Sequence, residues 1–371
     1  MAKLGEICEI LDSKRVPITA TERQPGPYPY YGANGVQDHV ADYIFDDDLV
    51  LLAEDGGNFG SKDKPIAYRV SGKCWVNNHA HVLKPKEGLD VDYLCYSLMF
   101  YDVTGLVNGA TRQKLTQADM RKMEIPLPSL DEQRKIAAVL DKVSDLIAKR
   151  RQQLGKLDEM VKSRFVEMFG NEKQFYKWNC LSIGDIAEVC VGVVIKPTQY
   201  YTDNSGIPAF RSLNVGAMTI KNTDWVYFTE QGHYKNKKSI IKENDVLVVR
   251  SGAPGTACVA TKKFEGYNAI DIIIAHPDTD KVNSVFLAMF TNMPHGMNQI
   301  RRKTGGAAQK HFNVSGYKSL SIILPPIELQ NQFAAFVEET EKIKTTISRS
   351  LEKLETLKKA LIQEYFDVER K

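Results

Sequence analysis

Residues 129–169 read SLDEQRKIAAVLDKVSDLIAKRRQQLGKLDEMVKSRFVEMF, and this stretch decides the fold. Its apolar residues recur at alternating steps of three and four, which is typical of a coiled-coil helix. Ser129 can cap the helix start with Glu132 three residues later, and Gly170 can end the helix. About 40 residues in a helix predict a rod of roughly 60 Å. The predicted seam of this rod is Ile136, Leu140, Val143, Ile147, Leu154, Leu157 and Val161.

The chain contains an internal repeat of this rod and of the domain before it. Residues 127–133 recur as residues 324–330, 197 residues later, and residues 4–10 match residues 183–189, 179 residues later. The predicted seam of the second rod is Ile343, Ile347, Leu351, Leu354 and Leu361. We therefore expect an α+β protein: two mixed α/β domains at 1–128 and 171–325, and two long antiparallel coiled-coil helices at 129–170 and 326–371, related by a pseudo-two-fold repeat.

Length and composition restrict the possible classes. A chain of 371 residues has room for two or three domains, and its net charge of +3 neither requires nor excludes nucleic acid as a partner. No apolar run approaches the length of a membrane span, and the N-terminus has no apolar signal core. The six cysteines form no C-x-x-C pair, so the sequence predicts no metal site and favours a reducing cytoplasm.

Motifs of catalysis are missing from the sequence. The turn at residues 56–62 resembles a phosphate-binding loop but lacks the Gly-Lys pair that such a loop needs. There is no G-x-S-x-G or H-E-x-x-H motif. An adenine amino-methyltransferase would need an Asn/Asp-Pro-Pro-aromatic tetrapeptide, and Pro325-Pro326 lies between Leu324 and Ile327 instead. The sequence therefore predicts a protein without catalytic residues of its own.

Basic and amide side chains in glycine-rich turns are candidates for contacts with nucleic acid. Lys and Arg suit phosphates and guanine edges, whereas Asn and Gln suit adenine edges. Basic residues in loops are mostly plain solvated surface. The recurrence of residues 112–114 and 309–310, and of the glycine turns, at matching places in the two halves supports binding at these places. The candidates are Lys62, Lys64, Asn77, Asn78, His79, Arg112 and Lys114 in the first domain, and Arg211, Asn214, Arg250, Lys262, Lys263, Arg301, Arg302, Lys303 and Lys310 in the second.

The segments that carry these features resemble a known family. Residues 125–141 (IPLPSLDEQRKIAAVLD) and 164–170 (RFVEMFG), with the echo ILPPIELQNQFA at 323–334, resemble the specificity subunit of a type I restriction–modification enzyme. Residues 77–83 (NNHAHVL) and 248–255 (VVRSGAPG) resemble its target recognition domains. The second echo departs from the first at Leu329 and Phe333, which stand where the first has Glu132 and Ile136.

The resemblance implies a non-catalytic DNA-binding subunit that reads a bipartite target in double-stranded DNA. Each recognition domain would read one half, and the helices would set the spacer and dock two modification subunits. Those subunits would carry S-adenosylmethionine and methylate adenine N6 by base flipping. The resemblance also implies association with restriction (translocase–nuclease) subunits.

Three other interpretations remain open from the residues alone. A methyltransferase or nuclease in its own right would transfer labelled methyl groups, or cut DNA, without a partner. A coiled-coil scaffold that binds no DNA would give no mobility shift with mixed-sequence duplex. The specificity subunit of a related single-chain restriction system would differ only in its partners.

Overall fold

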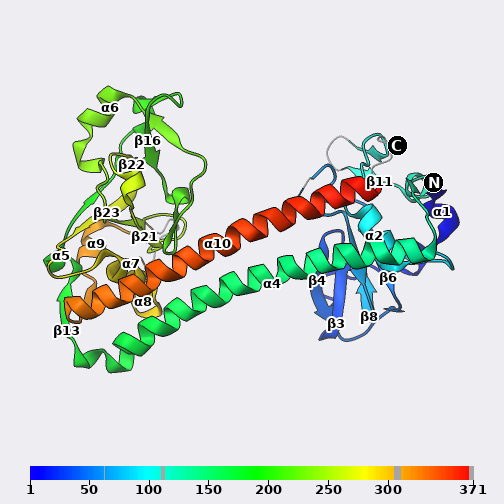
Figure 1. Cartoon of the computed structure of the whole chain (residues 1–371), viewed down its shortest axis with the longest axis horizontal. Coiled ribbons are helices and arrows are strands. Elements are labelled where there is room, and N and C mark those ends of the chain that lie inside the picture. Colours follow the sequence, from blue (N-terminus) through cyan, green and yellow to red (C-terminus); the bar gives the residue numbers. More distant parts are fainter. Residues whose placement is uncertain (62, 110–112, 305–310, 367–371) are drawn as a thin grey trace. The chain divides into compact units, whose positions relative to one another are not determined.

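The computed structural model describes residues 1–371 apart from 62, 110–112, 305–310 and 367–371. The chain forms two compact units: unit 1 is Met1–Gln152 with Ser348–Lys371, and unit 2 is Gln153–Ile347. Two long helices, α4 (Leu130–Phe169) and α10 (Ile327–Phe366), each contribute one part to unit 1 and one part to unit 2 (Figure 1).

In the described part of unit 1, two four-stranded sheets carry the fold. The elements in chain order are β1 (Ala2–Lys3), α1 (Leu4–Ile7), β2 (Cys8–Ile10), η1 (Asp12–Lys14), β3 (Pro25–Gly32), β4 (Gly35–Val40), β5 (Phe45–Asp46), β6 (Leu49–Ala53), β7 (Ala67–Val70), β8 (Lys73–Val76), β9 (Ala80–Pro85), α2 (Val91–Met99), β10 (Val107–Asn108), β11 (Lys114–Leu115), α3 (Gln117–Met120) and β12 (Glu124–Ile125). One sheet has the antiparallel order β2-β9-β6-β7. The other has the order β4-β3-β8-β5, in which β3 and β8 run parallel.

Unit 2 repeats this arrangement with longer insertions. Its elements are η2 (Glu172–Lys177), β13 (Asn179–Ser182), α5 (Ile183–Ile186), β14 (Ala187–Val191), η3 (Pro197–Tyr200), β15 (Tyr201–Thr202), β16 (Ile207–Phe210), η4 (Ser212–Asn214), β17 (Val215–Gly216), β18 (Thr219–Ile220), β19 (Val226–Phe228), α6 (Glu230–Lys235), η5 (Lys237–Ser239), β20 (Val246–Val249), β21 (Ala257–Val259), η6 (Lys262–Phe264), β22 (Asn268–Ala269), β23 (Ile272–Pro277), α7 (Ser284–Asn292), α8 (Pro294–Lys303), α9 (Val314–Lys318) and β24 (Ser321–Leu324). The sheet β14-β23-β20-β21 corresponds to β2-β9-β6-β7. In the second sheet, β15-β19-β16-β22, the parallel pair is β16 and β22.

The central strands of the two matching sheets are buried along their whole length. Every residue of β6 (LVLLA) and of β20 (VLVV) is buried, because each strand has apolar material on both faces. The helices α2 and α7 pack on the sheets beside these strands, and each starts at a side-chain cap. Asp90 accepts from the amides of residues 92 and 93, and Asn283 accepts from those of residues 285 and 286.

The long helices pair in antiparallel fashion inside each unit. In unit 1, the start of α4 at Ile136 shares a core with Ile362 near the end of α10, and Arg151 bonds Glu355 at 2.6 Å. In unit 2, Asp158 bonds Lys344 at 2.8 Å, and Phe165 meets Phe333 with ring centroids 5.4 Å apart. The predicted fold class, α+β with two repeated mixed domains and paired long helices, is confirmed.

The two ends of α4 follow the sequence signals. The amide of Glu132 donates to the Ser129 hydroxyl at 3.4 Å, as expected for a cap. Gly170 adopts a φ of +88°, which a residue with a side chain rarely adopts, and its amide bonds the carbonyl of Val166. Among the described helices, none combines the length and hydropathy needed to cross a bilayer.

The predicted seams differ in how deeply they are buried. In the first rod, Leu154 and Leu157 are half-buried, and the buried members are Ile136, Leu140, Val143, Ile147 and Val161. In the second, the half-buried members are Ile347, Leu351, Leu354 and Leu361. Ile343 is 46 % exposed and does not belong to the seam. Lys344 takes the inner face instead, because its long apolar stem can be covered while its ammonium bonds Asp158 and Glu341.

Candidate nucleic-acid interface

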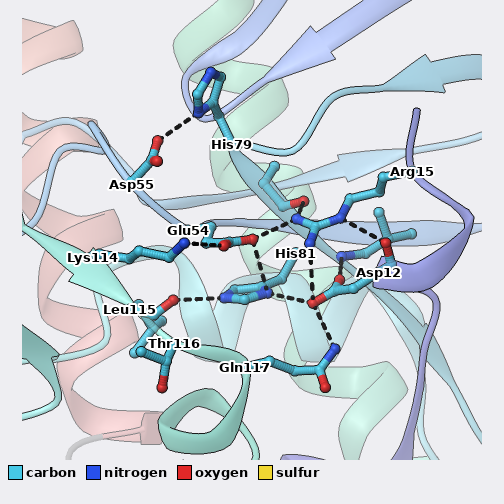
Figure 2. Close-up of polar contacts among 12 residues, drawn as sticks. Asp12, Arg15, Glu54, Asp55, His79, His81, Lys114, Leu115, Thr116 and Gln117 are labelled. Carbon is cyan, nitrogen blue, oxygen red and sulfur yellow. Dashed lines mark hydrogen bonds and ion pairs between the residues drawn. The ribbon is translucent and has the colours of Figure 1, made fainter. Parts of the chain in front are cut away.

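The predicted contact segments of unit 1 meet where β6 ends at its glycine-rich turn. His79 Nδ1 lies 2.7 Å from Asp55 Oδ1, and Lys114 Nζ lies 2.9 Å from Glu54 Oε1 (Figure 2). Glu54 and Asp55 directly follow β6, so the segments around residues 79 and 114 flank the same turn. The structure therefore brings together three stretches that are separated in the sequence.

A buried cluster of charged side chains holds together the end of β6 and the segments that flank its glycine turn. Arg15 bonds Glu54 at 2.6 Å, and His81 Nδ1 lies 2.6 Å from Asp12 Oδ2 (Figure 2). His81 Nε2 donates to the carbonyl oxygen of Leu115 at 2.9 Å. The side chains of Asp12 and Glu54 are 4 % and 11 % exposed, so little water competes for these bonds. Removing one partner would leave an uncompensated charge in the interior, which is costly.

The carboxyl groups of the cluster stay ionised despite their surroundings. Burial alone would raise the pKa of Asp12, but hydrogen bonds from His81, Gln117 and the amide of Val82 outweigh it and hold the pKa below its usual value. Burial also opposes ionisation of Glu54, and bonds from Arg15 and Lys114 lower its pKa. Both acids are therefore anionic acceptors that tie η1, β9 and β11 to the end of β6.

Asp12, Glu54 and His81 also form a grouping that could hold a metal ion, since their ligand atoms lie within 4.8 Å of one another. The protein's own cations already occupy the carboxylates: Arg15 and Lys114 bond Glu54. Each ring nitrogen of His81 already faces an oxygen atom of the protein, Asp12 Oδ2 on one side and the Leu115 carbonyl on the other. We therefore assign this cluster a structural role.

Unit 2 builds the same junction with the opposite charge. Arg250 follows β20 as Glu54 follows β6, and it pairs with Asp271 at 2.5 Å. Its Nε donates to the carbonyl of Phe312 at 3.0 Å. In unit 1, His81 makes the corresponding bond to the carbonyl of Leu115. The next turn packs on α8: a side chain at Gly255, whose φ is +93°, would meet Ile300. The basic end of α8 therefore lies near this turn.

Eight of the predicted contact residues are exposed. Lys114 and Lys262 are engaged in ion pairs with Glu54 and Glu265, and Lys263 Nζ lies 5.3 Å from the ring centroid of Phe264. The exposed set is Lys64, Asn78, Lys114, Lys262, Lys263, Arg301, Arg302 and Lys303. His79 and Arg211 are half-buried, and the guanidinium of Arg211 donates to the carbonyl of Asp224. Lys64, Asn78, Arg301, Arg302 and Lys303 are exposed candidates for phosphate or base contacts.

Three predicted contact residues form bonds inside their domains. Asn77 is 3 % exposed, and its amide bonds the side chain of Gln37 and the backbone of His79. Asn214 is fully buried, and its amide bonds the backbone around η4. Arg250 is held by Asp271 and Phe312. Asn77 and Asn214 are buried with their amides bonded inside the domain, so we correct the expectation that these two contact DNA. Arg250 is half-buried, and its contact with DNA stays a prediction. Lys62, Arg112 and Lys310 lie outside the described residues.

The sequence reasoning missed two glutamines that act identically in the two units. Gln133 is fully buried, accepts from the amide of Asp90 at 2.8 Å, and donates to the carbonyls of Gly88 and Pro128, both at 2.9 Å. Gln330 is fully buried and makes the matching bonds to the amide of Asn283 and to two carbonyls. Each ties the first turn of a long helix to the cap of α2 or α7. Their recurrence 197 residues apart was the available signal.

A cavity of about 570 Å³ opens beside the glycine turn of unit 1. The rings of Tyr31 and Tyr68 lie 5.8 Å apart at its wall, and Lys64 adds a positive charge. Its lining residues are Tyr31, Asn34, Gly35, Val36, Asn58, Lys64, Pro65 and Tyr68. The candidate interface of unit 1 thus combines a hollow with aromatic, amide and cationic groups.

Comparison with known proteins gives one family. The type I restriction modification DNA specificity domain matches residues 1–156 and 176–358. A putative type I restriction enzyme specificity subunit of Haemophilus influenzae is 28 % identical over 363 residues, covering 94 % of this chain and 89 % of its own. The MjaIX specificity subunit of Methanocaldococcus jannaschii is 25 % identical over 303 residues, covering 74 % of this chain and 68 % of its own.

Two solved structures share the fold. The S subunit of a type I restriction–modification system from M. genitalium superimposes with a TM-score of 0.58 at 12 % identity, covering 98 % of this chain and 95 % of its own. A chain from a study of complex assembly in a type I restriction–modification system gives a TM-score of 0.56 at 15 % identity, covering 98 % and 96 %.

Proposed function

The chain belongs to the family of type I restriction–modification DNA specificity proteins, and on that premise we propose that each of its two units reads one half of a bipartite DNA target. One observation carries the proposal. The same strand, glycine turn and flanking segments occur in both units, but with different side chains at equivalent places, Glu54 in one and Arg250 in the other. Two surfaces with the same arrangement of strands but different side chains suit a DNA target whose two halves differ in sequence.

The exposed side chains divide into two kinds of contact. Lys303, at the basic end of α8, suits a phosphate, because a lysine is a compact charge without a directional fork. Asn78 is exposed between β8 and β9, next to the glycine turn, and its amide can pair with an adenine edge. Phosphate contacts supply affinity for any sequence, and amide contacts supply the choice of base.

The long helices have a second role in this proposal: they set the spacer and dock two modification subunits. Large apolar side chains remain exposed on both helices, which supports docking of partner proteins. They are Val139, Leu146, Met160 and Val166 on α4, and Ile343 and Leu357 on α10. Ile343, which the sequence placed in the seam, is exposed instead, and this exposure fits a docking role. The partners would bring S-adenosylmethionine and the methyl transfer to adenine N6, and restriction subunits would join the same complex.

The test is methylome sequencing of cells that carry this chain with its modification subunit. The wild-type chain should give methylated adenines in a motif of two defined halves separated by an undefined spacer. Asn78→Ala should relax one base of one half, at a cost of about 1–3 kcal/mol, and leave the other half unchanged. Lys303→Ala should weaken binding to all sequences alike and reduce the salt slope by about one unit.

Lys135→Ala is the matched control, since Lys135 is an exposed lysine on α4 with a side chain 74 % exposed. It should change neither the motif nor the salt slope. The purified complex, weighed intact, should contain two modification subunits for each copy of this chain. A motif without a spacer, or an Asn78→Ala variant that alters both halves, would overturn the proposal.

A further inference from the structure

Three polar side chains form a row across adjacent strands of unit 2. Cys190 on β14 has its sulfur 3.8 Å from His276 Nε2 on β23, and His276 Nδ1 lies 2.5 Å from Asp245 Oδ1. Asp245 directly precedes β20, and the sheet order β14-β23-β20 places the three elements side by side. The order thiol, imidazole, carboxylate is the arrangement in which an acid orients a ring and the ring acts on a sulfur.

The carboxylate end of the row is firmly held. The side chain of Asp245 is 3 % exposed, and its second oxygen accepts the amide of Lys242 at 2.7 Å. The hydrogen bond to Asp245, with Cys190 on the other side, raises the pKa of His276 to about 9. The ring is therefore a cation at neutral pH and faces the sulfur with an N–H. Asp245 bonds the ring, and the other charged residues on the segments beside it are Glu188, Lys237, Lys238 and Lys242.

The other cysteines provide a built-in comparison. Cys180 is exposed, and its sulfur lies 3.9 Å from the carbonyl of Trp178. The remaining four are buried, and burial raises the pKa of each thiol to about 12, so they stay protonated. These four are Cys8, Cys74, Cys95 and Cys258. Only Cys190 combines partial exposure with a cationic ring among the described residues.

From this geometry we propose that Cys190 is a reactive thiol, a modification site for soft electrophiles and peroxides, activated by His276 and positioned through Asp245. In the resting thiol form the S–H donates to the carbonyl of Lys238 at 3.3 Å. Loss of the proton leaves a thiolate that accepts from the His276 cation instead. The thiolate is the nucleophile, so a neighbouring cation that stabilises it increases the rate at low pH.

The chemistry is a simple displacement. With iodoacetamide, the sulfur lone pair forms a bond to the methylene carbon, the carbon–iodine bond breaks, and iodide leaves. With hydrogen peroxide, a sulfur–oxygen bond forms, the oxygen–oxygen bond breaks, and the leaving hydroxide takes a proton to become water; the sulfur is oxidised to a sulfenic acid. Acyl transfer does not follow from this row, because the backbone group bonded to the sulfur is the Lys238 carbonyl, which would repel an oxyanion.

The experiment measures alkylation of each cysteine in the full chain, by iodoacetamide and peptide mass spectrometry, at about pH 6.5 and about pH 8.5. Taking the ratio of the two rates for each cysteine removes differences in accessibility. An ordinary thiol should react about 50-fold faster at the higher pH, because its thiolate fraction rises by that factor. We expect this ratio for Cys180 and a ratio below about tenfold for Cys190.

Two variants separate activation from mere exposure. His276→Gln removes the cation and should return the ratio at Cys190 to that of Cys180. Lys342→Gln removes a charge from α10, where Lys342 pairs with Glu338, and should leave the ratio unchanged. Since the wild-type ratio needs no variant, the proposal can be tested even if His276→Gln fails to fold. Equal ratios at Cys190 and Cys180 in the wild-type chain would overturn it.

Discussion

Replacing Gln133 by leucine should loosen the start of α2 while leaving unit 2 intact. Leucine has a similar size, so the change removes hydrogen bonds without opening a large hole. It leaves the amide of Asp90 and the carbonyls of Gly88 and Pro128 without their partner in a site where Gln133 is fully buried. An unsatisfied buried group costs about 1–3 kcal/mol. Since some of the three can reach water after a small shift, we expect a total of about 2–5 kcal/mol.

Hydrogen exchange is the assay, because it reports each segment separately. The amides at residues 90–95 should lose protection by about 30-fold to several thousand-fold, as a local opening cheaper by 2–5 kcal/mol implies. Gln330→Leu should produce the same loss at residues 283–288 in unit 2 and leave residues 90–95 unchanged. Gln152→Leu is the matched control, because Gln152 is exposed on α4 and its replacement should cost less than about 0.5 kcal/mol.

A glutamate at position 133 sharpens the test. Gln133→Glu keeps the oxygen that accepts from Asp90 but turns a second oxygen toward two carbonyls, where only a donor fits. A protonated carboxyl can supply that donor, so this variant should be more protected at about pH 5 than at about pH 8. If Gln133→Leu and Gln152→Leu exchange alike, or if Gln133→Glu shows no pH dependence, the amide does not hold the cap and our reasoning is wrong.

Two further predictions concern unit 2. Phe165 is 1 % exposed and packs against Phe169, Phe286 and Phe333, so Phe165→Ala should lower the free energy of unfolding by about 3–5 kcal/mol. The neighbouring Val166 is 37 % exposed, and Val166→Ala should change that free energy by less than about 0.5 kcal/mol. Urea unfolding followed by the fluorescence of Trp178 and Trp225 measures both. Similar losses for both variants would contradict the packing described here. His276 has a raised pKa of about 9, so its contribution is fully present below about pH 6.5 and is lost as the pH rises through 9. The free energy of unfolding of unit 2 should fall by about 1–3 kcal/mol over that range, and His276→Gln should flatten this part of the profile; a slope that survives the substitution would assign it to another group.

The long helices were predictable because their signal is local and repeated. A heptad pattern over some 40 residues, a cap at Ser129 and a stop at Gly170 all lie in one stretch of sequence, and the structure places α4 at Leu130–Phe169. The face of the second helix was harder to assign. Ile343 and Lys344 are neighbours, and hydrophobicity alone favours the isoleucine for the seam. The lysine lies on the inner face because its ammonium bonds Glu341 on the same helix and Asp158 on α4. The bond to Asp158 joins distant parts of the chain and cannot be read from the local sequence.

The contact residues were the least predictable part. An asparagine in a turn suits a base edge, but it suits backbone groups equally well. Asn78 is exposed, whereas the side chain of its neighbour Asn77 bonds Gln37 and the backbone of His79. Both are asparagines, so the sequence does not show which of the two is exposed. The same limit applies to Arg250, whose partner Asp271 becomes its neighbour only when β20 and β23 pair. Sequence reasoning found the segments, and the fold decides which side chains in them remain available.

The two units differ in local sequence at places where their architecture is the same. Phe333 stands where the first repeat has Ile136, and the residues that pack against these two positions differ as well. In unit 1 the corresponding core is formed by Ile136, Ile362, Phe366 and Tyr93, and in unit 2 by Phe333, Phe165, Phe169 and Phe286. The pair Tyr93 and Phe366, with ring centroids 5.1 Å apart, answers to Phe286 and Phe169 at 4.8 Å.

The charged junctions have diverged in the same compensated way. Glu54 forms ion pairs with Arg15 and Lys114, whereas Arg250 forms an ion pair with Asp271. A single residue moved from one repeat to the other would meet the wrong neighbours, either a core of the wrong volume or a like charge. Each unit has therefore been free to change its side chains only in groups that pack or pair together. The two units share the strand order that carries the glycine turn, and the exposed side chains around the turn differ between them.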